Sequence, residues 1–258
     1  YRDFFPDSHK RDDVPPTSLP ESLQTAIKCF IVTCAIRIVR GQENKHNSML
    51  IHISRYLIWQ NLLKEVIENQ FLFYKRGIEQ NDQSIMEQFR AIFEVDSDSY
   101  TSYCTTTQNI LNSSFKDIDN KIEVHKWEEI KPCLYKAVQK IKVMSINGKS
   151  TDALEYYENE KTGISVIAIG GDKLSRGLTL EGLSVSYFLR ASRMYDTLMQ
   201  MGRWFGYRPG YVDLCRLFTS SELNEWFRHI TMASEDLREE FDAMWNAKAT
   251  PEKYALKV

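Results

Sequence analysis

The side chains best suited to chemistry in this sequence are Asp172, Arg176, Arg203 and Arg208. All four lie within residues 163–216. The guanidinium group is a planar donor that matches phosphate, and gathering several arginines is costly unless an anion meets them. If their segments meet in the fold, the sequence predicts a phosphate-binding site.

Apolar runs broken by glycine surround these residues. The runs at 164–169 and 183–189, and a third that starts at Tyr211, are typical of strands in a parallel sheet buried on both faces. In such a sheet, ligands collect at the carboxyl ends of the strands. We therefore expect Asp172 and the arginines at that edge.

The rest of the chain alternates between strand and helix patterns, which predicts an α/β fold with a mainly parallel sheet. Two further strands are expected at 48–53 and 141–146. The expected helices span 19–39, 54–74, 85–93, 127–140 (which contains Pro132) and 221 to about 245.

Capping and periodicity give these helices expected ends and faces. A capping box from Ser18 to Glu21 is expected to start the first helix, and Arg40-Gly41 to close it. Ser54 and Ser221 are expected to cap later helices. The helix after Ser54 is expected to bury one apolar stripe, made of Leu57, Ile58, Leu62, Val66 and Ile67.

These elements predict one lobe interrupted by an insertion. The expected parts are a linker at 1–17, the first part of the lobe at 18–76, a mostly helical insertion at 77–125, the remainder of the lobe at 126–246, and a tail at 247–258.

Composition fits a globular protein, with 43% hydrophobic and 26% charged residues. The net charge of −2 limits any nucleic-acid surface to a local patch. An odd number of widely spaced cysteines, five, favours free thiols in a reducing compartment. The longest unbroken apolar run is too short for a bilayer, and the chain does not begin with methionine. We interpret it as a piece of a longer cytoplasmic protein without membrane contact.

Two motifs in the central stretch resemble those of superfamily-two helicases. The segment GGDKLSRGL resembles motif V, and QMGRWFGYR resembles motif VI with altered spacing. Thr179 stands where motif V usually has Asp. The matching positions are Asp172, Ser175, Arg176, Gly177 and Leu178 in motif V, and Gln200, Gly202 and Arg203 in motif VI.

The order of these blocks, with motif IV-like SMLIHIS upstream, resembles a C-terminal RecA-like lobe. More narrowly, residues 140–220 look like the Z1 domain of proteins classed as endonucleases. Those proteins are bacterial and helicase-like, and they are linked with restriction-modification or phage defence. The resemblance implies a RecA-like parallel sheet flanked by helices.

The resemblance also implies a half-site for a nucleotide. The N-terminal RecA-like lobe of the same protein would bind ATP and Mg²⁺, and this chain alone is expected to hold neither. Arg203 and Arg208, oriented by Gln200, would stabilise charge on the transferring phosphoryl group. The implied residues that couple the nucleotide to the motor are Asp172, Arg176, Gly177 and Thr179.

Nucleic acid is the expected track, with DNA favoured and RNA as the alternative; other defence-system subunits are further expected partners. Gly148-Lys149-Ser150 ends like a phosphate-binding loop, but Val143 stands where its first glycine is required. We therefore interpret the strand ends as contacts to a nucleic-acid backbone. The expected contacts are Ser54, Ser145, Asn147, Lys149, Gly170, Gly171 and Lys173.

Two other functions stay open. The first is a non-catalytic RecA-like module that recruits partners through residues 77–125. The second is a metal-dependent nuclease, but Asp117 and Asp119 next to Lys121 are expected to be solvated, and the histidines have no ligand spacing. We expect no metal site. The aromatic cluster either stacks on bases or belongs to the core; it comprises Trp204, Phe205, Tyr207 and Tyr211.

Overall fold

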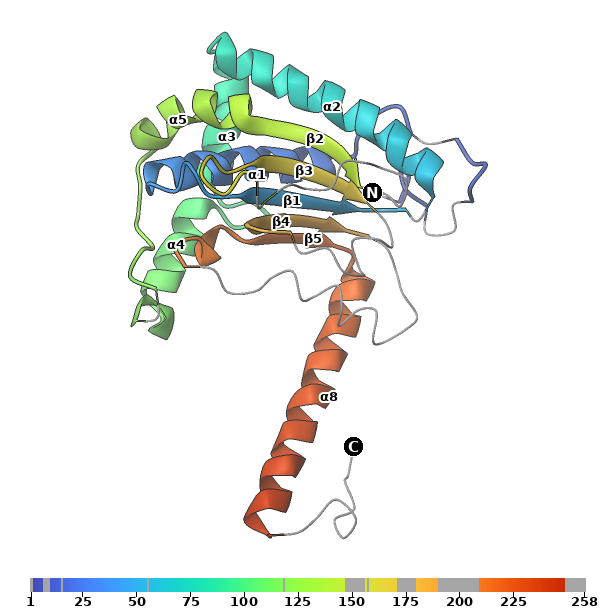
Figure 1. Ribbon diagram of the computed structural model, residues 1–258, viewed down its shortest axis with the longest axis vertical. Helices are drawn as coiled ribbons and strands as arrows, with labels where there is room; N and C mark the ends of the chain where they lie inside the picture. Colours follow the sequence, from blue (N-terminus) through green and yellow to red (C-terminus); the bar gives the residue numbers. More distant parts are fainter. Residues whose placement is uncertain are drawn as a thin grey trace.

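The fold is a five-stranded parallel sheet flanked by helices, seen in a computed structural model (Figure 1). The structure describes residues 2–6, 10–14, 16–54, 56–117, 119–146, 156, 158–170, 180–189 and 209–248. The strand order is β2-β3-β1-β4-β5, and every neighbouring pair is parallel. This confirms the expected α/β class and is consistent with a RecA-like fold.

The strands are β1 (Asn47–His52), β2 (Ile141–Ile146), β3 (Ser165–Gly170), β4 (Leu183–Phe188) and β5 (Arg216–Thr219). All residues of β1, β3 and β4 are buried. Continuous apolar runs form such central strands because both faces are covered.

The described helices are α1 (Glu21–Val39), α2 (Leu57–Glu79), α3 (Gln83–Glu94), α4 (Tyr103–Leu111), α5 (Trp127–Lys140) and α8 (Ser221–Asn246). Two 3-10 turns, η1 (Ser114–Asp117) and η2 (Val212–Leu214), complete the described elements. Pro132 lies inside α5 without dividing it. Residues 77–125, expected as a mostly helical insertion, contain the end of α2 together with α3, α4 and η1, and their status as an insertion stays a prediction.

One face of the sheet carries the main core. Met49 and Ile51 of β1, with Ile167 and Ile169 of β3, belong on this face to one cluster that also contains residues of α1, α2 and α5. Residues of α3 and α4 belong to the same cluster, among them Phe89. The helices of the insertion are therefore stabilised by the apolar core that stabilises the sheet.

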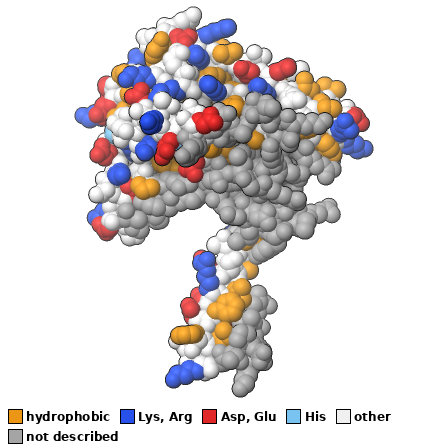
Figure 2. Space-filling model, viewed as in Figure 1, with side chains coloured by type: hydrophobic (Ala, Val, Ile, Leu, Met, Phe, Trp, Pro, Cys, Tyr) orange, Lys and Arg blue, Asp and Glu red, His pale blue; other side chains and the backbone are white. Residues whose placement is uncertain are grey.

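The opposite face carries a smaller core. Leu50, Val166 and Ala168 from the central strands form one cluster there with Leu180 and Leu183. A second cluster joins Phe188 to the first turns of α8. Beyond those turns α8 extends away from the sheet (Figure 1), and hydrophobic side chains lie on its surface (Figure 2).

Helix α1 is the most buried helix in the core. Its length and its mean hydropathy of 1.5 would also allow it to cross a bilayer. The search for unbroken apolar runs missed this helix, because polar residues interrupt it. In the fold, 67% of that window is buried, and α1 packs against α5 and the sheet. This is the burial expected of a core helix.

Several expected helix starts are wrong. Pro20 is the N-cap of α1 and no side chain caps it, so Ser18 and Glu21 form no capping box. Tyr56, not Ser54, is the N-cap of α2. In α8 the Oγ of Ser220, one residue before the expected cap, accepts the Leu223 amide. The closure of α1 at Arg40 is confirmed, and Gly41 has a φ of +70°.

The expected buried face of α2 is also wrong in part. Leu57, Ile58 and Leu62 are exposed. The buried stripe instead begins at Trp59 and runs through Leu63, Ile67, Phe71 and Tyr74. These residues follow the helical period, and the aromatic rings bury more area than the aliphatic residues that were expected there.

Candidate functional site

The carboxyl ends of the five strands form one level edge. Ile146 at the end of β2 pairs with Gly170 at the end of β3. Phe188 at the end of β4 pairs with His52 of β1 and with Thr219 of β5. Segments that leave the strands here therefore start side by side, as expected for a ligand site in a parallel sheet.

Most of the predicted site residues lie outside the described residues. They comprise Asn147, Lys149, Gly171, Asp172, Lys173, Arg176, Gly177, Thr179, Gln200, Arg203 and Arg208. The described residues before them, Ile146, Gly170 and Leu189, all lie at the carboxyl edge. Their roles stay predictions.

The structure describes three predicted site residues, Ser54, Ser145 and Gly170, and brings them to this edge. Ser54 and Ser145 are buried. The Ser54 Oγ accepts the Tyr56 amide at 3.1 Å, and the Ser145 Oγ donates to Asn61 Oδ1 at 3.5 Å. The Ser54 hydroxyl thus contacts the N-cap of α2 and the Ser145 hydroxyl contacts the second turn of that helix, while Gly170 offers only its backbone.

Polar side chains on the sheet were missed by the sequence reasoning. Ser48 and His52 of β1, with Ser184 and Ser186 of β4, are buried on the face opposite α1. The His52 ring lies 5.2 Å from the Phe188 ring. In β4 the signal was the alternation of polar and apolar residues from Leu183 to Tyr187, which indicates that the two faces meet different surroundings; β1 has no such alternation.

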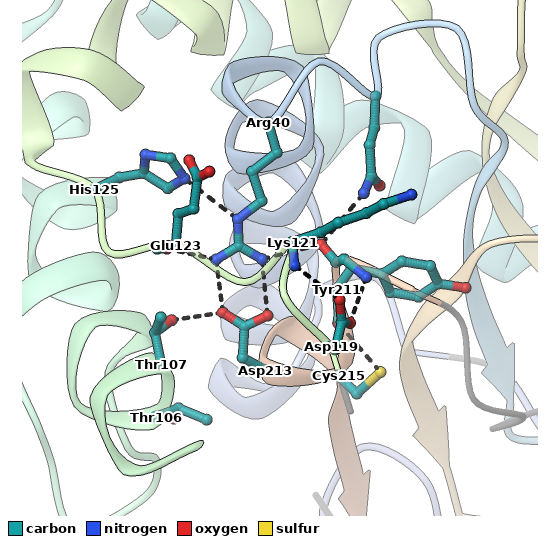
Figure 3. A network of polar contacts seen from close by, with 12 residues as sticks. Arg40, Thr106, Thr107, Asp119, Lys121, Glu123, His125, Tyr211, Asp213 and Cys215 are labelled. Carbon is teal, nitrogen blue, oxygen red and sulfur yellow. Dashed lines mark hydrogen bonds and ion pairs between the residues drawn. The ribbon is translucent and has the colours of Figure 1, made fainter. Parts of the chain in front are cut away.

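A second polar cluster lies at the amino ends of the strands (Figure 3). Arg40, which ends α1, forms an ion pair with Asp213 of η2 at 2.7 Å, and their side chains are 2% and 0% exposed. Arg40 Nη1 also donates to Asp213, at 2.8 Å, and the Thr107 hydroxyl donates to the same carboxylate at 2.6 Å. Because these hydrogen bonds are buried, they fix the end of α1, η2 and α4 relative to one another.

The remaining donors of Arg40 reach the loop before α5 and the turn before η2. They donate to the carbonyl oxygens of Glu123 and Gly210 at 2.9 and 3.1 Å, and to Nε2 of His125 at 3.3 Å. Burial, with the Arg40 charge as the next cause, lowers the pKa of His125. All these bonds are internal, so the cluster is suited to holding segments together.

Asp119 is a correction to the sequence reasoning. It was expected to be solvated but is buried, and its carboxylate accepts the Gly210 amide at 2.5 Å and the Lys121 amide at 3.1 Å. It therefore closes a turn, while Asp117 is exposed as expected. Tyr211 is also buried, in the core, beneath the Arg37 guanidinium at 4.3 Å from the ring centroid.

No group of three or more His, Cys, Asp or Glu side chains within the described ranges could hold a metal ion. The five cysteines are free. Burial raises the pKa of Cys29 to about 11 and that of Cys34 to about 12, so both stay as thiols at neutral pH. Neither is an activated nucleophile.

The comparisons with known proteins add one finding. The sequence matches the Z1 domain over residues 22–258, which is nearly the whole chain. No curated protein and no solved structure matches it. The match includes residues 140–220, whose sequence resembled this family, and all five strands of the sheet. The chain therefore belongs to the Z1 domain family.

Proposed function

We propose that this Z1 domain is the C-terminal motor lobe of a nucleic-acid-dependent ATPase within a helicase-like endonuclease of a restriction or defence system. The observation that carries the proposal is the level carboxyl edge, where Ile146 pairs with Gly170 and His52 pairs with Phe188. The three segments that bear the predicted residues start directly after β2, β3 and β4. Parallel sheets bind nucleotides at this edge.

The proposed chemistry is a shared ATP site. Arg203 and Arg208 stabilise negative charge on the transferring phosphoryl group, and Gln200 orients them. Asp172 and Arg176 couple this event to the nucleic acid. Magnesium is assigned to the partner lobe, as the resemblance to superfamily-two helicases implies. ATP is the substrate, with its phosphate chain held by the same partner lobe.

The nucleic-acid track is proposed to run along the carboxyl edge. Ser54 and Ser145 are buried there against α2, so their side chains position the edge, and the contacts to the track come from neighbouring backbone and lysine groups. Backbone phosphates are the groups that such contacts recognise. DNA is the favoured track, and RNA is the alternative.

The test is ATP hydrolysis by a protein in which this chain is joined to a lobe with a phosphate-binding loop. Hydrolysis is measured with and without DNA or RNA. Arg203→Ala is expected to reduce turnover by about a thousandfold, the typical value of an arginine that contacts the γ-phosphate. Arg228→Ala, on the exposed side of α8, is the matched control and is expected to leave turnover unchanged.

The choice of arginine sharpens this test. Arg208 directly precedes Pro209, which lines a cavity at the amino ends of the strands. Arg208 is thus bonded to a residue at the edge opposite the proposed ATP site, so Arg203 is the stronger candidate and Arg203→Ala is the deciding variant. Wild-type turnover in both single variants and in the double variant would reject the motor proposal. DNA cleavage by this chain alone, with metal added, would favour the nuclease instead.

A further inference from the structure

A cavity at the amino ends of the strands has Arg37, Arg40, Lys45 and Lys121 among its lining residues. Its volume is about 500 Å³, within the range of small-molecule sites. It lies between the turn after α1, the Gly182 turn before β4 and the Tyr211 segment before β5. It is thus at the opposite end of the strands from the proposed ATP site.

Arg37 is the buried cation of this cavity. Its side chain lines the cavity although the residue is only 3% exposed. Its donors reach neutral acceptors: Nε donates to Gln42 Oε1 at 2.8 Å, and Nη1 donates to the His46 carbonyl and to Asn47 Oδ1 at 2.7 and 2.6 Å. Within the described residues no carboxylate forms an ion pair with Arg37, and its Nη2 makes no hydrogen bond.

The neighbouring Arg40 shows the difference. The Arg40 side chain is also buried, at 2% exposed, but it has the carboxylate of Asp213 at 2.7 Å, so its charge is neutralised inside the protein. No carboxylate in the described part of the chain pairs with Arg37, and burial, the largest cause, lowers its pKa. A buried charge is costly unless it is paired. An anion in the cavity would supply the missing charge.

Three further groups could contact such an anion. Lys45 and Lys121 line the cavity, are exposed, and form no ion pair with any carboxylate that the structure describes. His46 Nδ1 accepts the Ile164 amide at 3.2 Å, so the neutral ring carries its proton on Nε2 and offers a donor there. Among the described lining residues Glu181 is the one acidic side chain, and the cations outnumber it.

We propose that this amino-edge cavity binds a small phosphate monoester through its phosphate group. The cavity offers one guanidinium and two ammonium groups. These three cations match the double negative charge of a phosphate monoester better than the single charge of a carboxylate ligand. The cavity is larger than a phosphate ion, so it leaves room for an organic part. The site is independent of the proposed ATPase function, because it uses other residues at the other edge of the sheet.

The test is isothermal titration calorimetry of this chain with inorganic phosphate and with glucose 6-phosphate, using glucose and acetate as comparison ligands. Saturable binding of glucose 6-phosphate is expected, with a Kd of about 1 mM or tighter. The double variant Lys45→Ala/Lys121→Ala is expected to weaken it at least about tenfold, because two charge-assisted contacts are lost. Both lysines are exposed, so the variant should fold normally, which its Tm checks.

Lys131→Ala is the matched control, since Lys131 is an exposed lysine on α5 that does not line the cavity, and it should bind like the wild type. Arg203→Ala should also bind like the wild type, which separates this site from the ATP site. Absence of saturable binding up to about 10 mM would overturn the proposal. So would equal binding by the double lysine variant, or binding of a single-stranded oligonucleotide in place of the phosphate monoester.

Discussion

The buried ion pair between Arg40 and Asp213 gives the sharpest prediction about stability. Asp213→Ala removes a carboxylate that accepts two bonds from Arg40 and one from Thr107, at 2.6–2.8 Å. The guanidinium would remain inside the protein, where only 2% of the side chain is exposed, without its counter-charge. The variant therefore loses three hydrogen bonds and also carries the cost of an unpaired buried charge.

The expected loss is about 3–5 kcal/mol of unfolding free energy, the usual cost of removing one partner of a buried pair. For a chain of this size, that corresponds to a fall in Tm of roughly 6–20 °C. The measurement is urea denaturation followed by circular dichroism, with Tm from a thermal scan. Glu94→Ala, which removes an exposed i,i+4 partner of Arg90, is the matched control and should leave the midpoint unchanged.

A double variant separates the unpaired charge from lost packing. Arg40→Met combined with Asp213→Leu removes both charges and fills the space with apolar atoms. It is expected to be more stable than Asp213→Ala alone, because no buried charge is left unpaired. An Asp213→Ala variant within about 1 kcal/mol of the wild type would refute the reasoning, since it would mean that Arg40 reaches water or another anion easily.

Three further predictions follow from the same structure. Gly182→Ala should destabilise the fold far more than Gly41→Ala, as measured by urea denaturation. Both glycines have φ near +70°, but a Cβ at Gly182 would meet the His46 carbonyl oxygen, whereas a Cβ at Gly41 would meet nothing within 4 Å. The thiols of Cys29 and Cys34 should react with a thiol reagent at pH 8 only after unfolding, because burial raises their pKa to about 11 and about 12; reaction kinetics with and without urea measure it. Burial lowers the pKa of His46 and His125 below the ordinary value of 6.5, so the unfolded state binds more protons than the folded state. Stability should therefore fall as pH drops below about 6.5, and His125→Gln should flatten the profile of Tm against pH between pH 7 and 5.

The strands could be predicted closely because their signal is local. Residues 141–146 were predicted as a strand and form β2 residue for residue, and the strand expected at 48–53 is shifted by one residue. A run of apolar residues between turns is sufficient when both faces of the strand are buried. The start of β5 was wrong, since η2 comes first and the strand begins at Arg216.

The amino-edge polar contacts could not be predicted, because their partners are far apart in the sequence. Arg40 and Asp213 are separated by 173 residues, and Asp119 and Gly210 by 91. No periodicity or spacing links such residues. Arg40 was assigned only to the end of a helix, and Asp119 to a solvated turn, since an isolated charged residue is usually on the surface.

The candidate site at the carboxyl edge is a different case. Its location followed from the parallel sheet, and the described strand ends are level as that reasoning requires. Ser54 and Ser145 were expected at this edge and lie there, but their hydroxyls contact α2. A sequence pattern places a residue at the end of a strand, while the direction of its side chain depends on the helix packed beside it.

The two edges are connected by the segment between β4 and η2. At its start, the Leu189 amide donates to the His52 carbonyl at 3.1 Å, on the carboxyl edge. At its end, Gly210 is held by Asp119 and Arg40, and Tyr211 packs beneath Arg37. The described ends of this segment thus lie at opposite edges of the sheet, and the buried contacts of Asp119, Arg40 and Arg37 fix its C-terminal end at the amino edge.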